Sequence, residues 1–233
     1  MLNTDQKKLI WDLPLRLFHW LLVLSILGSW YTSEQDGDMV DQHMLLGYFI
    51  LGLVIFRILW GFLGTKHALF SQFIPSPNDI HSYAKQINTP TAPKHPGHNP
   101  LGSLMVVMMI ITILAQAVSG LFINDDIFSS GPYYEIFGSE FSKWMKTVHY
   151  YAFDVMLVLI GLHLSAIVFY WWKKKMNLVL PMITGKKSAK DVDEQDQIPH
   201  SKLLTALILV IAVAVFVYWL VVINAPVLEE FYY

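Results

Sequence analysis

Residues 148–172 read VHYYAFDVMLVLIGLHLSAIVFYWW and are apolar almost throughout. This length is enough for one helix to cross a lipid bilayer, which needs about 20 apolar residues. The stretch also carries two histidines, His149 and His163, fourteen residues apart. At about 100° and 1.5 Å per residue, fourteen steps return both rings to one helix face and separate them by roughly 21 Å along the axis. The stretch therefore predicts a membrane-spanning helix with an imidazole near each membrane surface, and it suggests two stacked cofactors beside that helix.

The composition also places the chain in a membrane. Of its 233 residues 55% are hydrophobic and only 15% are charged, a balance too apolar for a soluble domain of this size. Apolar blocks of span length occur five times, at residues 13–31, 43–62, 101–123, 147–172 and 203–223. The sequence therefore predicts an all-α integral membrane protein. The formal net charge of −2 gives no reason to expect a nucleic acid partner.

The chain contains no cysteine. It therefore cannot form disulfides, thiolate-held iron–sulfur clusters or the covalent c-type haem attachment that uses Cys-x-x-Cys-His. Its charged start, followed by the apolar residues 13–31, resembles a signal peptide. However, the apolar run is too long and no small-residue cleavage site follows it. We interpret this run as a retained first span.

Lysine and arginine alternate between the two sides of the predicted spans. The N-terminal start and the connections 63–100 and 173–202 are basic, whereas the connections 32–42 and 124–146 are mainly acidic. The positive-inside rule assigns the basic connections to the cytoplasm. We therefore expect a multi-pass protein of the bacterial inner membrane, with its N-terminus cytoplasmic and its C-terminus periplasmic.

The chain divides at its long basic connection. We expect residues 1–185 to form a four-helix transmembrane domain, 186–202 a cytoplasmic linker, and 203–233 a fifth transmembrane helix with an external tail. Ser76 and Asp79, with Pro77 between them, are typical of a capping box. This motif predicts a short interfacial helix over residues 77–88, and the Pro- and Gly-rich residues 89–100 predict a loop.

The depth of each histidine predicts two pairs. His19 lies near the cytoplasmic start of the first span, and His163 lies at a similar depth in the fourth. His43 and His149 each lie at an external span start. We expect His19 to face His163 and His43 to face His149. Each pair would join two helices, which bis-histidine ligation of a haem held between helices requires.

Two arginines lie on the same helix faces as these histidines. Arg16 precedes His19 by three residues, and Arg57 follows His43 by fourteen. Guanidinium groups pair well with carboxylates, so both arginines suit the propionates of the haem near His19. Arg16 equally suits a snorkelling role at the membrane surface.

Small residues follow the same pattern. Gly47 lies one turn after His43, and Gly161 lies close to His163 in sequence. A missing side chain lets a flat macrocycle approach the backbone. Helix packing explains Gly47, Gly52 and Gly161 equally well.

The remaining histidines fall in connections or at span edges. We interpret all five as solvated surface groups: His67, His81, His95, His98 and His200. The third span has Gln116 as its main polar residue. Packing is its simplest role, and contact with a quinone is the alternative.

Two segments resemble a known family. Residues 11–20, WDLPLRLFHW, and residues 43–60, HMLLGYFILGLVIFRILW, resemble the first two helices of bacterial cytochrome b561 proteins and of the cytochrome b subunits of Ni,Fe hydrogenases. The two-histidine span resembles the fourth helix of that family. The resemblance covers about residues 10–185 and implies a four-helix transmembrane di-haem bundle. Here a fifth C-terminal transmembrane helix is an addition.

The resemblance implies ligands and a function. It implies two haem b groups with iron ligands His19, His43, His149 and His163, the same residues that depth pairs. It also implies electron transfer between the quinone pool and a partner protein. A periplasmic hydrogenase or c-type cytochrome would be that partner, and a basic patch on it would dock on external acidic residues: Asp125, Asp126, Glu135 and Glu140.

Two other functions are compatible with the sequence. One is a self-contained superoxide:quinone oxidoreductase, for which Lys143 and Lys146 beside His149 would attract the anion. The other is a histidine-based transporter or proton channel, because intramembrane histidines also serve as proton relays. Bis-histidine haems lack an open position, which favours an electron carrier.

Overall fold

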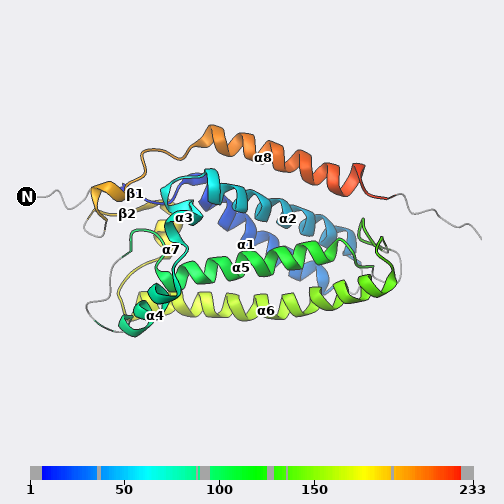
Figure 1. Cartoon of the computed structure of the whole chain (residues 1–233), viewed down its shortest axis with the longest axis horizontal. Helices are drawn as coiled ribbons and strands as arrows, with labels where there is room; N and C mark the ends of the chain where they lie inside the picture. Colours follow the sequence, from blue (N-terminus) through cyan, green and yellow to red (C-terminus); the bar gives the residue numbers. More distant parts are fainter. Residues whose placement is uncertain are drawn as a thin grey trace, which may run out of the picture.

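Long helices dominate the computed structural model, which describes residues 7–35, 38–87, 89, 95–124, 129–134, 136–189 and 192–226. Within these residues, five helices are long and apolar enough to cross a membrane. They are α1 (Leu13–Ser33), α2 (Val40–Leu63), α5 (Pro100–Gly120), α6 (Ser139–Trp172) and α8 (Leu203–Tyr218), which a π-helical turn, Trp219–Ile223, continues. Helices α1, α2, α5 and α6 form a bundle, and α8 lies along its outside (Figure 1), packed mainly on α2. The predicted all-α membrane fold is confirmed.

Short elements gather at one end of the bundle, where α1 begins (Figure 1). The longest of them is α4 (Pro77–Gln86). The others are β1 (Lys7–Leu9), η1 (Lys66–Ala68), α3 (Phe70–Phe73), α7 (Val179–Thr184), β2 (Lys186–Ser188) and η2 (Glu194–Asp196). The two ends of the bundle therefore differ, and we call this group of short elements the cap.

Side-chain caps explain why several helices begin where they do. Asp12 accepts a hydrogen bond from the main-chain nitrogen of Leu15 at 2.7 Å, and Asn99 accepts one from Gly102 at 2.9 Å. Ser76 and Asp79 form the predicted capping box. That prediction is confirmed, although α4 ends at Gln86, two residues before the expected end.

Two span boundaries differ from the prediction for physical reasons. Helix α6 begins at Ser139, eight residues before the predicted residue 147. Its first two turns mix charged and aromatic residues, so the apolar block from which the span was predicted begins later than the helix. Helix α5 ends at Gly120, three residues early, because the following loop binds its end. The nitrogen of Tyr133 donates to the carbonyl of Leu121 at 2.9 Å.

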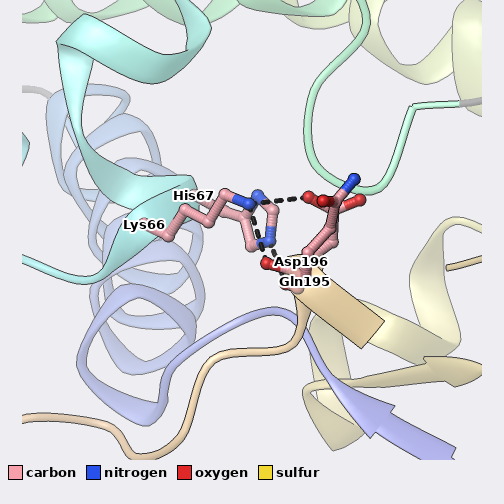
Figure 2. A network of polar contacts seen from close by, with 4 residues as sticks. All are labelled: Lys66, His67, Gln195 and Asp196. Atoms are coloured by element: carbon pink, nitrogen blue, oxygen red, sulfur yellow. Dashed lines mark hydrogen bonds and ion pairs between the residues drawn. The ribbon is translucent and has the colours of Figure 1, made fainter. Parts of the chain in front are cut away.

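The segment predicted as a linker, residues 186–202, is docked on the bundle over the part that the structure describes. Strand β2 pairs antiparallel with β1, and the nitrogen of Ile198 donates to the carbonyl of Leu9 at 2.9 Å. Lys66 and His67 both point toward Asp196 (Figure 2). The Nζ of Lys66 lies 2.7 Å from a carboxylate oxygen of Asp196, and Nε2 of His67 lies 2.7 Å from its main-chain carbonyl. The segment therefore joins the N-terminus, the membrane domain and α8.

A buried carboxylate connects the first two spans. Asp12 has no exposed surface. It accepts hydrogen bonds from Trp60 Nε1, at 3.2 Å, and from the Thr65 hydroxyl. Because the start of α1 and the end of α2 meet here, this contact joins the two spans about two turns before His19.

Candidate functional site

Helix α6 presents its two histidines to two different helices. The ring of His163 faces that of His19 on α1, with centroids 6.5 Å apart and planes inclined by 54°. The ring of His149 faces that of His43 on α2, with centroids 6.3 Å apart and planes inclined by 73°. The structure therefore brings together the two pairs that depth predicts. All four residues are partly buried.

The spacing within each pair suits a metal between the rings. A metal bound by one nitrogen of each imidazole, at about 2 Å from each, holds the two ring centroids roughly 6.3 Å apart. The observed separations are 6.3 and 6.5 Å. Both pairs are inclined rather than stacked, and both have this spacing although they lie at two different levels of α6.

Hydrogen bonds orient both rings of the His43/His149 pair. Nδ1 of His43 donates to the main-chain carbonyl of Ser29 on α1 at 2.9 Å. Nδ1 of His149 donates to the main-chain carbonyl of Gln116 on α5 at 2.9 Å. Such bonds fix the ring and the tautomer of a metal-binding histidine, because they leave Nε2 unprotonated.

The side chain of Gln116 reaches the other nitrogen of His149. Its Nε2 lies 2.9 Å from Nε2 of His149, and its buried Oε1 has no hydrogen-bond partner. The amide N–H donates to the lone pair that a metal would use. A metal held by Nε2 of His149 would take the place of this hydrogen bond.

Two small residues of α5 complete this environment. The hydroxyl of Ser119 lies 3.2 Å from Nδ1 of His149. A Cβ atom added at Gly120 would lie 3.3 Å from Cε1 of His149, tighter than usual packing. Ser29, Gln116, Ser119 and Gly120 are functional candidates that the histidine pattern did not indicate. Only Gln116, as the main polar residue of its span, carried a visible signal.

The His19/His163 pair is held differently. Nδ1 of His19 is buried without a hydrogen-bond partner, and no hydrogen bond reaches the His163 ring from the described residues. Trp20 packs edge-on against His19 at 5.1 Å. Packing, rather than hydrogen bonding, therefore positions these two rings.

Arg57 is almost fully buried, with 2% of its surface exposed. Its guanidinium donates to the main-chain carbonyl of Ala68 at 3.3 Å and lies over the rings of Phe70 and Phe73 at 5.2 and 5.5 Å. Its Nη2 has no partner. A buried cation with a free N–H group is suited to an anionic ligand group.

Arg16 lies at the same end of the bundle. Its guanidinium bonds the main-chain carbonyl of Ile183 on α7, and its buried Nε has no partner. The close approach of Gly185, which adopts a positive φ of 80°, encloses this nitrogen. Arg16 is thus tied to the cap, and its buried Nε has no acceptor among the described residues.

The two glycines singled out in the sequence both border open space. A Cβ atom added at Gly47 or Gly161 would meet no atom within 4 Å. Gly52 differs, because its added Cβ would touch Val213 and Val217 of α8 at 3.7 Å. Gly52 therefore packs a helix, whereas Gly47 leaves space on the His43 face.

The prediction that five histidines are solvated is wrong for three of them. His67 is 7% exposed and bonds Asp196 (Figure 2). His95 Nε2 and His98 Nδ1 are buried without partners. Burial, with the nearby charge of Arg57, lowers the pKa of His98 to about 3. Burial also lowers the pKa of His67. The docked segment 186–202 and the loop before α5 cover these rings, which a sequence pattern does not reveal. His81 and His200 are exposed as predicted.

The residues proposed for contacts outside the membrane are only partly described. Asp125, Asp126 and Glu135 lie outside the described residues. Glu140 is exposed and pairs with Lys143 at 2.8 Å. This pairing offsets the charge that an approaching anion would meet near His149.

Comparison with known proteins identifies the family. A family model described as prokaryotic cytochrome b561 matches residues 10–185. The chain belongs to this family. Prokaryotic cytochrome b561 proteins are b-type cytochromes, so this is a multi-pass membrane protein of electron transfer that uses haem b. The match covers all four paired histidines and ends where the docked segment begins.

Curated relatives of this cytochrome b561 protein are similar over most of their length. A probable Ni/Fe-hydrogenase B-type cytochrome subunit of Rhizobium leguminosarum bv. viciae is 23% identical, over 81% of this chain and 92% of the relative. Proteins with the same name from Rhodobacter capsulatus and Azotobacter vinelandii are 24% and 26% identical, each over 78% of this chain and over 82% and 89% of their own lengths. Comparison with solved structures gives no significant match.

The residues of this cytochrome b561 protein fit haem b. Two imidazole pairs have the spacing of bis-histidine ligation, and Gly47 borders open space on one ligand face. The buried Arg57 and the partly buried Arg16 each have one buried nitrogen without a partner. A haem b bound by two histidines would use each of these features: the imidazole nitrogens for its iron, the space beside the ligand, and the arginines as partners for its propionates.

Proposed function

We propose that this protein is a di-haem b-type cytochrome that carries electrons across the membrane between a redox protein and quinone. His43 and His149 would hold one haem, and His19 and His163 the other. The observation that carries the proposal is the presence of two facing imidazole pairs at opposite ends of α6. Their ligating positions are fourteen residues apart, so two redox centres lie near the two membrane surfaces.

Each group of residues has a defined task in this proposal. Bound haem b supplies one-electron oxidation and reduction of its iron. Each imidazole pair would hold the iron of one haem and would leave it no open position for oxygen, which favours electron transfer. The carbonyls of Ser29 and Gln116 keep His43 and His149 in the tautomer that ligates through Nε2. Arg57 and Arg16 would hold the propionates of the second haem.

We infer that the redox partner is a hydrogenase. The relatives are named as Ni/Fe-hydrogenase B-type cytochrome subunits, and they cover most of this chain. The positive-inside rule supports a cytoplasmic end for the cap and a periplasmic end for the His43/His149 pair. The hydrogenase would then dock beside His149, and a c-type cytochrome is the alternative partner there.

A reduced-minus-oxidised visible spectrum of the purified protein, with extracted haem counted per chain, tests the proposal. We expect two non-covalent, low-spin b-type haems. A colourless protein would overturn the proposal and favour a histidine-based transporter or proton channel. A single haem would show that one of the two pairs does not ligate.

The second function that is compatible with the sequence is that of a superoxide:quinone oxidoreductase. It needs Lys143 and Lys146 as an entry for the anion, and Glu140 already pairs with Lys143. Replacing both lysines by alanine separates the two functions. If the protein is the oxidoreductase, turnover of this variant with superoxide would fall. If the protein is the electron carrier, reduction of the variant by a hydrogenase would persist.

A further inference from the structure

Helix α6 carries an acidic side chain deep inside its span. Asp154 lies five residues after His149 and nine before His163. At about 1.5 Å per residue it is therefore roughly 7.5 Å and 13.5 Å along the axis from the two histidine levels. In the five spans that the structure describes, no other charged residue lies between these levels. An ionisable side chain at such a depth is costly, and it usually has a function.

Asp154 points away from the paired histidines. Five steps of about 100° place it about 140° around α6 from His149. The residue is exposed, and no hydrogen bond or ion pair reaches its carboxyl group from the described residues. Helix α8 does not cover it, because α6 and α8 lie on opposite sides of the bundle (Figure 1). In a single copy of the chain this carboxyl group therefore faces lipid, where nothing satisfies it.

Asp154 belongs to a stripe of exposed residues along α6. Successive members are three or four residues apart, and all lie within about 80° of one another around the helix axis. This is the repeat by which two helices pack side by side. The six exposed residues of the stripe are Thr147, Tyr151, Asp154, Val158, Gly161 and Ser165.

Two small residues make this stripe easy to approach. A Cβ atom added at Gly161 would meet no atom within 4 Å, and the hydroxyl of Ser165 donates to the carbonyl of Gly161 in its own helix at 2.7 Å. Small residues four positions apart let the backbone of a second helix come close inside a membrane, and a polar side chain nearby hydrogen-bonds across the contact. The stripe has both features, with Asp154 as the polar group that lacks a partner.

A second copy of the chain supplies what this stripe lacks. Copies of one chain insert in the same orientation, so a two-fold axis that relates two of them runs along the membrane normal. Each residue on the contact then lies at the depth of its own counterpart. Asp154 would meet Asp154 of the second copy, and two carboxyl groups that share a proton donate and accept a hydrogen bond between them. The described spans offer no cation at this depth that could pair with Asp154 instead.

We propose that the stripe around Asp154 is the contact through which two copies of this chain associate in the membrane. The two α6 helices pack along their stripes, the two Asp154 side chains share a hydrogen bond, and the backbones approach at Gly161. The contact goes beyond the proposed electron transfer, because the histidine rings lie on the other side of α6.

Sedimentation equilibrium of the purified, haem-loaded protein in a density-matched detergent measures the dimer dissociation constant. Asp154→Leu removes an unsatisfied carboxyl group from apolar surroundings, so the single copy should still fold. We expect this variant to dimerise about tenfold more weakly, the effect of losing a hydrogen bond between membrane helices. Asp154→Asn keeps a side chain that both donates and accepts, so its dissociation constant should stay close to that of the wild type.

Gly161→Leu tests the close approach of the two backbones. The added side chain meets no atom of its own copy, but it separates the two helices, and the dimer should again weaken about tenfold or more. Ala212→Leu is the matched control, because Ala212 is an exposed small residue of α8. Its dissociation constant should equal that of the wild type.

A cross-link in native membranes locates the contact. The chain has no cysteine, so Val158→Cys introduces a single thiol into the stripe. Oxidation with copper phenanthroline should link two copies of this variant by a disulfide. Ile211→Cys is the control, because Ile211 on α8 is 56% exposed, similar to Val158 at 62%. It should remain unlinked.

The outcomes separate this proposal from the proposed function, because haem is counted in the same samples. Two haems per chain in a protein that stays monomeric at every protein-to-detergent ratio, with no disulfide in Val158→Cys, would overturn the dimer alone. A dimer that Asp154→Leu and Gly161→Leu leave unchanged would use another face and would also overturn the proposal. An equal loss in Asp154→Asn and Asp154→Leu would overturn the pairing of the two carboxyl groups. Absence of haem from the wild type would overturn the proposed function.

Discussion

His43 and His149 face each other with ring centroids 6.3 Å apart, and each donates its Nδ1–H to a carbonyl of the neighbouring helix. Helices α2 and α6 thus carry the two imidazole rings, and carbonyls of α1 and α5 set the orientation of these rings. This arrangement is typical of metal-binding histidines, whose second nitrogen is held by an acceptor. The His19/His163 pair has the same spacing without these bonds.

Single substitutions should remove one haem at a time. His43→Ala and His149→Ala should each lower the haem content from two per chain to one, because an axial bond is lost. The double variant His43→Ala/His149→Ala should also retain one haem. By contrast, His43→Ala/His19→Ala should retain none. Pyridine haemochrome spectra with protein quantification give these counts.

His81→Ala is the control for these variants, because His81 is exposed on α4, away from both pairs. It should keep two haems. A double variant of His43 and His149 that loses both haems would contradict the pairing.

The two haems should differ in reduction potential. The hydrogen bonds from His43 and His149 to carbonyls make these ligands more basic, which stabilises oxidised iron. Near the other pair, Arg57 and Arg16 favour the reduced state, which carries less positive charge. We expect the His43/His149 haem to titrate lower by at least about 60 mV, a tenfold ratio for a one-electron couple. In a redox titration, the His43→Ala variant should lack the transition at the lower potential. Loss of the transition at the higher potential would contradict this assignment.

Sequence reasoning reached the spans and the histidine pairs because both follow from periodicity. Apolar blocks report bilayer length, and fourteen residues return His163 to the face of His149. Loop geometry does not follow from periodicity. The burial of His67 depends on Asp196, 129 positions away, and a cavity beside Ser103 depends on how α3 and α4 pack near the start of α5. Gln116 was visible as a polar residue, but its contact with His149 required the packing of α5 on α6.

We predict that a haem occupies the open space beside Gly47. An added Cβ there meets no atom within 4 Å, so Gly47→Leu should fold and remain in the membrane. If a haem occupies this space, the leucine side chain displaces it, and the haem content should fall from two to about one. Helicity by circular dichroism should stay unchanged. Gly52→Leu is the contrasting variant, because it strikes Val213 and Val217 and should disturb α8 instead. Two haems in Gly47→Leu would show that the macrocycle does not use this space.

Acid should destabilise the cap. The pKa of His98 lies at about 3 in the folded protein, below its ordinary value of 6.5. The unfolded chain therefore binds a proton between these values that the folded chain does not. The stability contribution of neutral His98 is complete above pH 6.5 and decreases as the pH falls toward 3, by at most about 1.4 kcal/mol per pH unit.

Thermal unfolding in detergent at pH 7.5, 6 and 5 measures this dependence. His98→Gln cannot be protonated in this range, so its midpoint should fall less than that of the wild type. His81→Gln, on an exposed residue, is the control and should follow the wild type. Since burial also lowers the pKa of His67, part of the acid sensitivity should remain in His98→Gln. Parallel curves for the wild type and His98→Gln would contradict the assignment.

The buried carboxylate of Asp12 should be among the largest single contributors to stability. Asp12→Ala removes the helix cap at Leu15, which costs about 0.5–2 kcal/mol. It also leaves the Trp60 and Thr65 donors without their acceptor, at roughly 1–3 kcal/mol each. Together these losses amount to about 2.5–8 kcal/mol, measured by denaturant unfolding in detergent. Asp79→Ala removes an exposed capping box and should cost only about 1 kcal/mol. Asp12 joins α1 to α2 at the end of the bundle that carries His19, so its loss should also release the His19/His163 haem before the other. Equal retention of both haems would show that this contact stabilises the fold without positioning the site.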